Sequence, residues 1–177
     1  AACVVRRRAT RRDACVLAGA GVSADTVHMT APDRTGAGLR RAIVQALSRA
    51  RCSAGALDAV IAHGTGTRYN DAMEIAALEP LLKPVQEPVP GRGTAVTAVK
   101  GLIGHTLGAS GLVETLLAQR MLESQCVPAI TGLEAPESAV LDFVMGAAPP
   151  RRLRHILKTA AGCGGFNAAV ILGQREA

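Results

Sequence analysis

The stretch Leu57-Asp-Ala-Val-Ile-Ala-His-Gly-Thr-Gly-Thr67 joins a run of small apolar residues to a loop rich in glycine and threonine. The apolar run, Leu57–Ala62, predicts a buried strand, and His63 follows it directly. The loop glycines would let backbone amides approach a ligand, and the threonine hydroxyls could hydrogen-bond it. These loop residues are Gly64, Thr65, Gly66 and Thr67. The stretch therefore predicts a strand that delivers a histidine-bearing polar loop to a ligand site.

A second histidine, His105, has a similar setting further along the chain. The segment Thr94–Val99 alternates β-branched and small residues, which predicts a strand, and the glycine-rich segment Gly101–Gly111 with His105 follows it. Such loops present side chains to a ligand from a rigid scaffold. Two imidazoles could hydrogen-bond one carbonyl oxygen as it gains negative charge, or one could transfer a proton. We therefore expect His63 and His105 to form a catalytic pair.

Helices and strands alternate along the rest of the chain. Helices are predicted at Gly38–Ala50, from the caps Asn70 and Asp71 through Leu82 to a stop at Pro84, and at Leu112–Leu122, which is apolar on nearly every face and hence buried. Further strands are predicted at Cys15–Ala20, Val140–Met145, His155–Thr159 and Ala168–Gly173. Loops are predicted at Val22–Arg34, at the proline-rich Lys83–Arg92 and at a tight turn with Gly162, Gly164 and Gly165. This succession predicts an α/β fold with a mixed β-sheet covered by helices, in a single domain spanning 1–177.

The composition narrows the class of protein further. Hydrophobic residues make up 49% of the 177 residues but aromatic residues only 2%, so the core must consist mainly of alanine, valine, leucine and isoleucine. Because bases are bound by stacking on aromatic rings, nucleic acid is a poor candidate ligand. No apolar run approaches the ~20 residues that span a bilayer, and the arginine-rich start lacks the hydrophobic stretch of a signal peptide. We expect no membrane association and a cytoplasmic location.

The cysteines and arginines carry weaker signals. Five cysteines without paired C-x-x-C spacing argue against a disulfide framework or a metal site and favour buried free thiols. They are Cys3, Cys15, Cys52, Cys126 and Cys163. The net charge of +6 comes largely from two clusters, one with Arg6, Arg7, Arg8, Arg11 and Arg12 and one with Arg151, Arg152 and Arg154. Such a charge suits an acidic partner, although either cluster could be an ordinary solvated face.

Three motifs, in this order, carry a resemblance to a known family. They are Ala62–Glu74, Val99–Gly111 and Gly162–Ala168, and the upstream segment Asp25–Pro32 fits the same pattern. From about Asp13 to Leu172, the chain resembles the β-ketoacyl-acyl carrier protein synthases of the thiolase superfamily, and the ketosynthase subunits of bacterial polyketide systems most of all. The resemblance implies the C-terminal half of a thiolase-like fold.

The family's reaction is a decarboxylative Claisen condensation of malonyl-acyl carrier protein with an acyl thioester. By resemblance, His63 and His105 would hold the malonyl thioester carbonyl and promote decarboxylation. Thr65 and Thr67 would line the channel for phosphopantetheine, which carries the substrate, so that no further cofactor is expected. The acyl carrier protein, acidic in these families, would dock on an arginine cluster.

Some other residues match the family pattern and are given supporting roles, and one residue differs from that pattern. Lys100 would pair with Glu114, as an orienting ion pair rather than an acid–base catalyst, because a buried lysine beside a carboxylate stays charged. Asp71 and Glu74 are assigned to capping and local structure. Cys163 stands where the synthases place a bulky aromatic residue and is expected, with Phe166, to shape the substrate pocket; a thiolase-like catalytic role for Cys163 is the alternative.

The nucleophilic cysteine of the family belongs to the N-terminal half, and none of the five cysteines has its setting. A complementary half on a partner chain would have to supply it, and the assembled enzyme would dimerise further. A split gene, proteolysis or a partial sequence would each give such a half. Two alternatives stay open: a non-catalytic subunit comparable to a chain-length factor, and a purely structural remnant.

Overall fold

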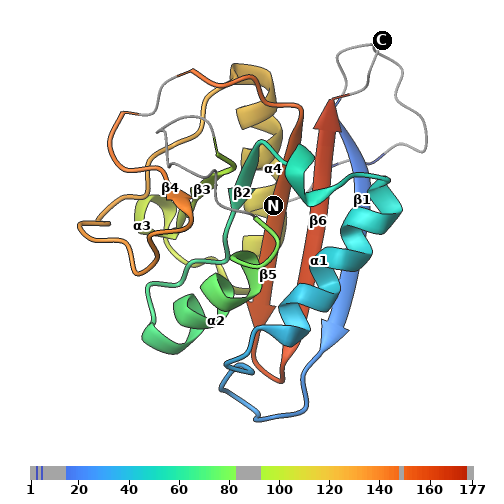
Figure 1. The fold of residues 1–177 in the computed structure, drawn as a ribbon, viewed down its shortest axis with the longest axis vertical. Helices are drawn as coiled ribbons and strands as arrows, with labels where there is room; N and C mark the ends of the chain where they lie inside the picture. Colours follow the sequence, from blue (N-terminus) through green and yellow to red (C-terminus); the bar gives the residue numbers. More distant parts are fainter. Residues whose placement is uncertain (1–2, 4, 6–14, 83–92, 148–149, 175–177) are drawn as a thin grey trace.

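A six-stranded mixed sheet with the order β1-β6-β5-β2-β3-β4 organises the chain (Figure 1). The computed structural model describes residues 3, 5, 15–82, 93–147 and 150–174. The elements are β1 (Cys15–Ala24), α1 (Ala37–Ala50), the 3₁₀ turn η1 (Ala54–Ala56), β2 (Ala59–Ile61), α2 (Arg68–Leu78), β3 (Ala95–Thr97), α3 (Lys100–Ile103), the 3₁₀ turn η2 (Leu107–Ala109), α4 (Ser110–Ser124), β4 (Asp142–Phe143), β5 (His155–Gly162) and β6 (Phe166–Gln174). The expected α/β fold with a helix-covered mixed sheet is confirmed.

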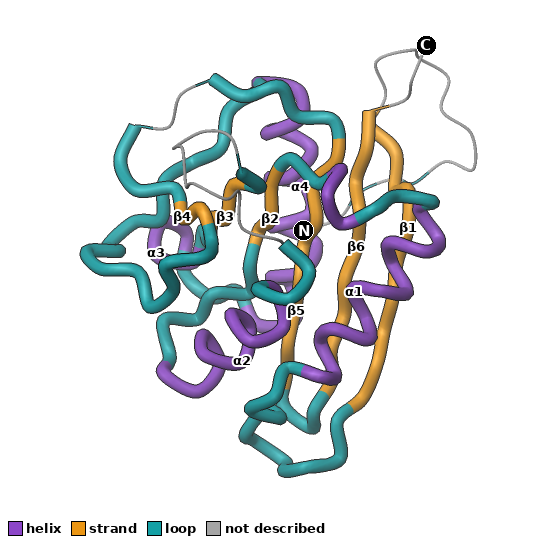
Figure 2. Tube along the Cα trace, viewed as in Figure 1, coloured by secondary structure: helices purple, strands orange, loops and turns teal. Residues whose placement is uncertain are grey.

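The sheet is buried on both faces because its apolar side chains alternate between two cores. Leu157, Val60 and Ile171 belong to one core, which α1 and α2 cover. Their neighbours Ile156 and Leu172 belong to the second core, which contains residues of α4. Side chains alternate across a strand, so two neighbouring apolar residues serve two cores. Figure 2 shows α1 lying along β1 and β6, and α4 behind the sheet.

The strand directions determine where the polar loops gather. β2 runs parallel to β3 on one side and to β5 on the other. The carboxyl ends of β2 and β3 therefore meet at one edge of the sheet, where ligands bind in α/β folds. β5 turns back into β6 as an antiparallel hairpin, and β1 pairs antiparallel with the outer side of β6. The residues that follow β2 and β3 are thus brought together.

Close contact between α1 and β1 depends on two glycines of the strand. A Cβ atom on Gly21 would overlap the backbone oxygen of Ala42, and one on Gly19 would overlap that of Ala46. Only residues without a Cβ allow the helix backbone to lie this near to the strand. The approach holds the strand end at Ala24 and the adjoining Asp25 in place beside the β5–β6 turn.

Several predicted boundaries need correction. β1 continues to Ala24, so Val22–Ala24 are strand and not loop. The second helix begins at Arg68 with Thr67 as its cap and ends at Leu78, so the expected caps Asn70 and Asp71 lie inside its first turn. The last strand of the parallel part shrinks from Val140–Met145 to Asp142–Phe143.

Other features of the structure differ in smaller ways from those predicted from the sequence. The segment Gly101–Gly111, expected as a loop, contains α3 and η2. α4 is buried along one face only, with Leu112 and Leu116 half-buried, so the expectation of a fully buried helix was wrong. Gly162 ends β5, and the turn itself is made by Gly164 and Gly165 at positive φ. The five cysteines are free, as expected, but all are exposed or half-buried and not buried. The predicted turn Lys83–Arg92 lies outside the described residues.

No helix in the described ranges is both long and apolar enough to cross a bilayer.

Candidate active site

The two histidines approach each other across the carboxyl edge of the sheet. His63 follows β2, His105 follows α3, and their ring centroids lie 5.5 Å apart with an angle of 85° between the ring planes. His63 is buried, whereas His105 is exposed. The pair opens into a cavity of about 1070 Å³. Six residues proposed from the sequence line this one cavity, namely His63, Thr65, Thr67, His105, Cys163 and Phe166.

Lys100 contacts His63 through both its ring and its backbone. The ammonium Nζ lies 2.5 Å from the backbone oxygen of His63, 3.4 Å from its Nδ1 and 2.5 Å from Oε1 of Glu114. A charged ammonium has three N–H donors and no acceptor, so these three acceptors match it completely. Nδ1 of His63 must therefore accept, and the ring proton sits on Nε2. His63 is a hydrogen-bond donor at its free nitrogen.

His105 is held in the same tautomer by different partners. The backbone N–H of Leu107 donates to Nδ1 of His105 at 3.0 Å, and the Ser110 hydroxyl lies 3.0 Å from the same nitrogen. A backbone amide can only donate, so Nδ1 of His105 is an acceptor and its proton is on Nε2. The turn that achieves this has Leu107 at φ +49°, a conformation that non-glycine residues rarely adopt and that is found at functional sites. Both imidazoles therefore present Nε2–H groups.

Lys158 is a functional candidate that sequence reasoning missed. It lies in the middle of β5, is 2% exposed and places Nζ 2.7 Å from Oε2 of Glu114. Glu114, from α4, therefore faces two lysines, one at each oxygen. The signal in the sequence was a lysine inside the apolar predicted strand His155–Thr159. Lysine is almost never fully buried without a partner, so a lysine at this position predicts a buried partner.

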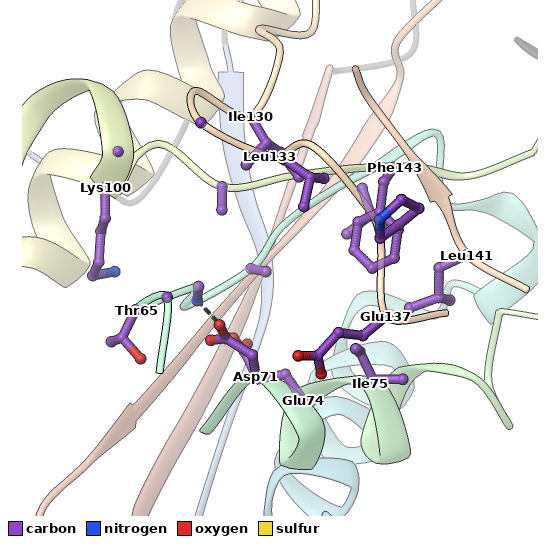
Figure 3. A pocket seen from close by; sticks show the side chains of 18 of the residues that line it. Thr65, Asp71, Glu74, Ile75, Lys100, Ile130, Leu133, Glu137, Leu141 and Phe143 are labelled. Atoms are coloured by element: carbon purple, nitrogen blue, oxygen red, sulfur yellow. Dashed lines mark hydrogen bonds between the residues drawn. The ribbon is translucent and has the colours of Figure 1, made fainter. Parts of the chain in front are cut away.

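Glu74 fixes the loop that carries His63. Its Oε1 accepts from the backbone N–H of His63 at 2.8 Å and from the Thr159 hydroxyl at 2.9 Å, and its Oε2 accepts from the N–H of Gly64 at 2.6 Å. Figure 3 shows Glu74 reaching from α2 to this loop. Burial raises the pKa of Glu74, while the donated hydrogen bonds oppose the rise. Glu74 thus does more than the expected local structural role, because its buried carboxylate positions His63.

The surroundings of His63 keep its ring neutral. Burial lowers the pKa of His63 to about 3, and the charges of Lys100, Lys158 and His105 add to the shift in that order. At neutral pH the ring is therefore uncharged and keeps one proton, on Nε2. The arrangement suits a group that donates a hydrogen bond to a developing oxyanion better than a group that takes up a proton.

The β5–β6 turn and the segment after β1 meet beside this cavity. The N–H of Asp25 donates to the oxygen of Gly165 at 2.7 Å, and the amide Nδ2 of Asn167 donates to Oδ2 of Asp25 at 2.9 Å. These contacts place Cys163 and Phe166 on the cavity wall, where both are exposed. On the loop after β2, the hydroxyls of Thr65 and Thr67 lie 2.8 Å apart. A channel wall of hydroxyl, thiol and phenyl groups results.

A second cavity, of about 420 Å³, shares Thr65 and His105 with the first and is also lined by Lys100 (Figure 3). Its far wall is apolar and includes Leu133 and Phe143. Asp71 also lines it, where burial raises the pKa of this carboxyl and the charge of Glu137 raises it further. Asp71 thus faces a cavity, beyond the capping role expected for it.

Nothing in the described ranges brings together three or more histidine, cysteine, aspartate or glutamate side chains in a group that could hold a metal ion.

Comparisons with known proteins agree with one another. Residues 14–134 match the family described as "Beta-ketoacyl synthase, C-terminal domain". A Streptomyces cyaneus protein named polyketide beta-ketoacyl synthase 1 is 37% identical over 159 residues, which are 89% of this chain and 36% of that protein. The 3-oxoacyl-[acyl-carrier-protein] synthase 2 of Mycobacterium bovis is 35% identical over 170 residues, 94% of this chain and 39% of that protein. The chain thus spans well under half the length of these relatives.

Solved structures give the same result. A ketosynthase in complex with its chain length factor, from Xenorhabdus doucetiae, is 31% identical with a TM-score of 0.77 over 90% of this chain and 39% of the solved chain. A beta-ketoacyl synthase from Burkholderia phymatum is 28% identical with a TM-score of 0.78 over 90% of this chain and 37% of the solved chain.

Proposed function

The chain belongs to the family of β-ketoacyl synthase C-terminal domains, with the fold of the C-terminal half of a thiolase-like enzyme, and on this premise we propose that it supplies the two active-site histidines of a condensing enzyme. The reaction is the decarboxylative Claisen condensation of malonyl-acyl carrier protein with an acyl thioester. Substrate arrives on the phosphopantetheine arm of the carrier protein, along the wall formed by Thr65 and Thr67.

The observation that supports this proposal is the matched tautomer of the two histidines. Lys100 holds Nδ1 of His63 as an acceptor, and the N–H of Leu107 does the same for His105. Two Nε2–H groups can then donate to one thioester carbonyl oxygen, provided that the oxygen sits between rings 5.5 Å apart. Donors arranged before the reaction begins stabilise an oxyanion without reorganisation.

The chemistry follows from this donor pair. The bond between the malonyl α-carbon and its carboxylate breaks, carbon dioxide leaves, and the electron pair spreads onto the thioester oxygen as an enolate. The Nε2–H groups of His63 and His105 stabilise that oxygen. The α-carbon then attacks the acyl thioester, a carbon–carbon bond forms, and the cysteine thiolate that held the acyl group departs. Neutral imidazoles suffice, because no proton has to be removed to make the carbanion.

The nucleophilic cysteine is proposed to come from a complementary N-terminal half. Relatives are well over twice as long as this chain, and exposed apolar side chains gather on the segments around the first cavity. These are Val27, Met29, Leu102, Ile103, Leu107 and Phe166. Exposed apolar surface of this kind marks an interaction site. A covering half would also shield His105, which is exposed here, and so strengthen its hydrogen bond to substrate.

The carrier protein is proposed to dock on the arginines near residue 152. Arg152 and Arg154 are exposed. Arg151 differs from both, because it forms an ion pair with Asp142 at 2.7 Å and donates to the backbone oxygen of Gly93 at 2.8 Å. The proposed docking surface therefore includes Arg152 and Arg154 but not Arg151. The first cluster, Arg6 to Arg12, lies outside the described residues.

Native mass spectrometry of the chain purified from its own cells tests the assembly. The proposal expects a second polypeptide with a cysteine that becomes acylated when the complex is incubated with acyl-carrier protein. A monodisperse chain alone, with no acylation of any associated cysteine, would overturn the assembly. An acylated complex that releases no carbon dioxide from malonyl-carrier protein would favour the alternative of a chain-length-factor-like binding subunit.

A further inference from the structure

Lys158 occupies a place in the site that neither the histidine pair nor the lysine–glutamate pair explains. It extends from β5, where it is paired in register with Ile61 of β2, two residues before His63. Its ammonium donates to the backbone oxygen of Thr159 and lies 2.7 Å from Oε2 of Glu114. It also lines the cavity into which His63 and His105 open.

Two lysines share one buried carboxylate. Glu114 is 1% exposed and gives Oε1 to Lys100 and Oε2 to Lys158. Oε2 has no hydrogen-bond donor with good geometry in the described part of the chain, so the charge of Lys158 is what compensates it. A buried carboxylate oxygen without a partner is costly, and the side chain would rotate to share Lys100 between both oxygens. That rotation would draw Lys100 away from His63.

We infer that Lys158 is a positioning residue, which fixes Glu114 so that Lys100 stays on His63 and holds the ring in its donor tautomer. This inference rests on the proposed function, because the donor tautomer of His63 is what that function needs. The side-chain partners of Lys158 are Glu114 and the backbone oxygen of Thr159. It acts through Glu114 and Lys100.

The charged groups around His63 predict the direction of the effect. Lys100 faces its ring from α3, His105 from the loop after α3, Lys158 from β5, and Glu74 of α2 accepts from its backbone N–H. Glu114 of α4 faces the two lysines. Burial lowers the pKa of Lys158, and the charge of Glu114 opposes that change. Removal of Lys158 takes away one cation beside His63 and should make the ring easier to protonate.

The test is a histidine titration by ¹⁵N–¹H NMR in the full chain, with Lys158→Met compared with wild type. The variant should raise the His63 midpoint by about half a pH unit or more and should mix the two neutral tautomers. Lys158→Arg, which keeps the charge, should restore the single Nε2–H tautomer. Arg154→Gln, which removes an exposed charge, should leave His63 unchanged because solvent screens it.

An unchanged His63 midpoint and tautomer in Lys158→Met would overturn the inference. If circular dichroism shows that Lys158→Met does not fold, Lys158→Gln replaces it, because glutamine keeps a hydrogen-bond donor without the charge. The same changes in the His63 midpoint and tautomer are expected for Lys158→Gln. An equal effect of Arg154→Gln would also contradict the inference, since the effect would then be unspecific. The titration needs no substrate, so the inference can fail while carbon dioxide release persists, and the proposed function can fail while Lys158 still controls His63.

Discussion

Nζ of Lys100 lies 3.4 Å from Nδ1 of His63 and, with its two other donors, binds the backbone oxygen of the same residue and Oε1 of Glu114. One ammonium thus contacts both the ring and the backbone of His63, while Glu74 holds the loop through two backbone N–H groups. Only one of the three contacts of Lys100, the one with Glu114, is an ion pair. The contact of Lys100 with Nδ1 leaves Nε2 of His63 as the nitrogen that carries the ring proton.

The first prediction concerns the tautomers themselves. Long-range ¹⁵N–¹H correlation spectra at pH 7 should show His63 and His105 as neutral rings protonated at Nε2, since both Nδ1 atoms accept from fixed donors. In Lys100→Met, His63 should lose this preference while His105 keeps it. A protonated Nδ1 on either ring in the wild-type chain would contradict the donor-pair geometry.

The second prediction concerns Glu114. Glu114→Gln removes the carboxylate that two buried lysines share, so the free energy of unfolding should fall by about 3 kcal/mol or more. Urea denaturation measures this loss. The exposed Glu134→Gln is the matched control and should change stability by no more than about 0.5 kcal/mol. Equal stability of the two variants would show that the buried cluster does not depend on Glu114.

The third prediction concerns pH. His63 has a pKa of about 3 in the folded chain, below the value of 6.5 that is usual for a histidine in an unfolded chain. Between pH 3 and pH 6.5 the unfolded state binds a proton at His63 that the folded state does not bind. The folded chain therefore has its full stability with respect to this residue above pH 6.5 and loses stability as the pH falls toward 3. Relative to His63→Gln, the wild-type chain should lose stability from pH 6.5 to pH 5, by less than the full slope of about 1.4 kcal/mol per pH unit because the cavity is open to solvent.

Urea unfolding of both proteins at several pH values measures this difference. The carboxyls of Asp71 and Glu74, whose pKa values are raised, act in the opposite direction, but they are present in both proteins and cancel. A difference in stability that stays constant between pH 6.5 and pH 5 would show that His63 is not held neutral.

The fourth prediction separates the arginines. Arg152→Glu with Arg154→Glu should weaken binding of acyl carrier protein several-fold and reduce its dependence on salt, because both side chains are exposed. Arg151→Glu should instead lower stability, because it breaks the ion pair with Asp142. Fluorescence anisotropy with labelled carrier protein measures the binding. Unchanged affinity in the double variant would place the carrier protein elsewhere.

Much of this architecture was predictable from local pattern. Apolar periodicity predicted the helix Gly38–Ala50, which is observed as Ala37–Ala50, and the alternating segment Thr94–Val99 contains β3. The pairing of two strand-end histidines was also predictable, because parallel neighbours end at one edge of a sheet. Their convergence at 5.5 Å is what the structure adds.

The errors have physical causes. α2 begins at Arg68 although Asn70 and Asp71 are good caps, because Thr67 is the last residue in extended backbone and the helical conformation starts directly after it. The role of Glu74 was missed because its partners are backbone N–H groups, which no side-chain pattern reveals. Lys158 was missed because its partner Glu114 is 44 positions away in sequence and meets it only through the packing of α4 on β5.

Release of carbon dioxide from labelled malonyl-acyl carrier protein by the assembled complex tests the central claim most directly. Loss of one oxyanion donor costs about 10²- to 10³-fold in rate, so His63→Asn and His105→Asn should each reduce release by at least about 100-fold while the partner cysteine still accepts the acyl group. His28→Asn, in the exposed loop near the cavity, should retain the wild-type rate. Wild-type release of carbon dioxide in both His63→Asn and His105→Asn would contradict the account.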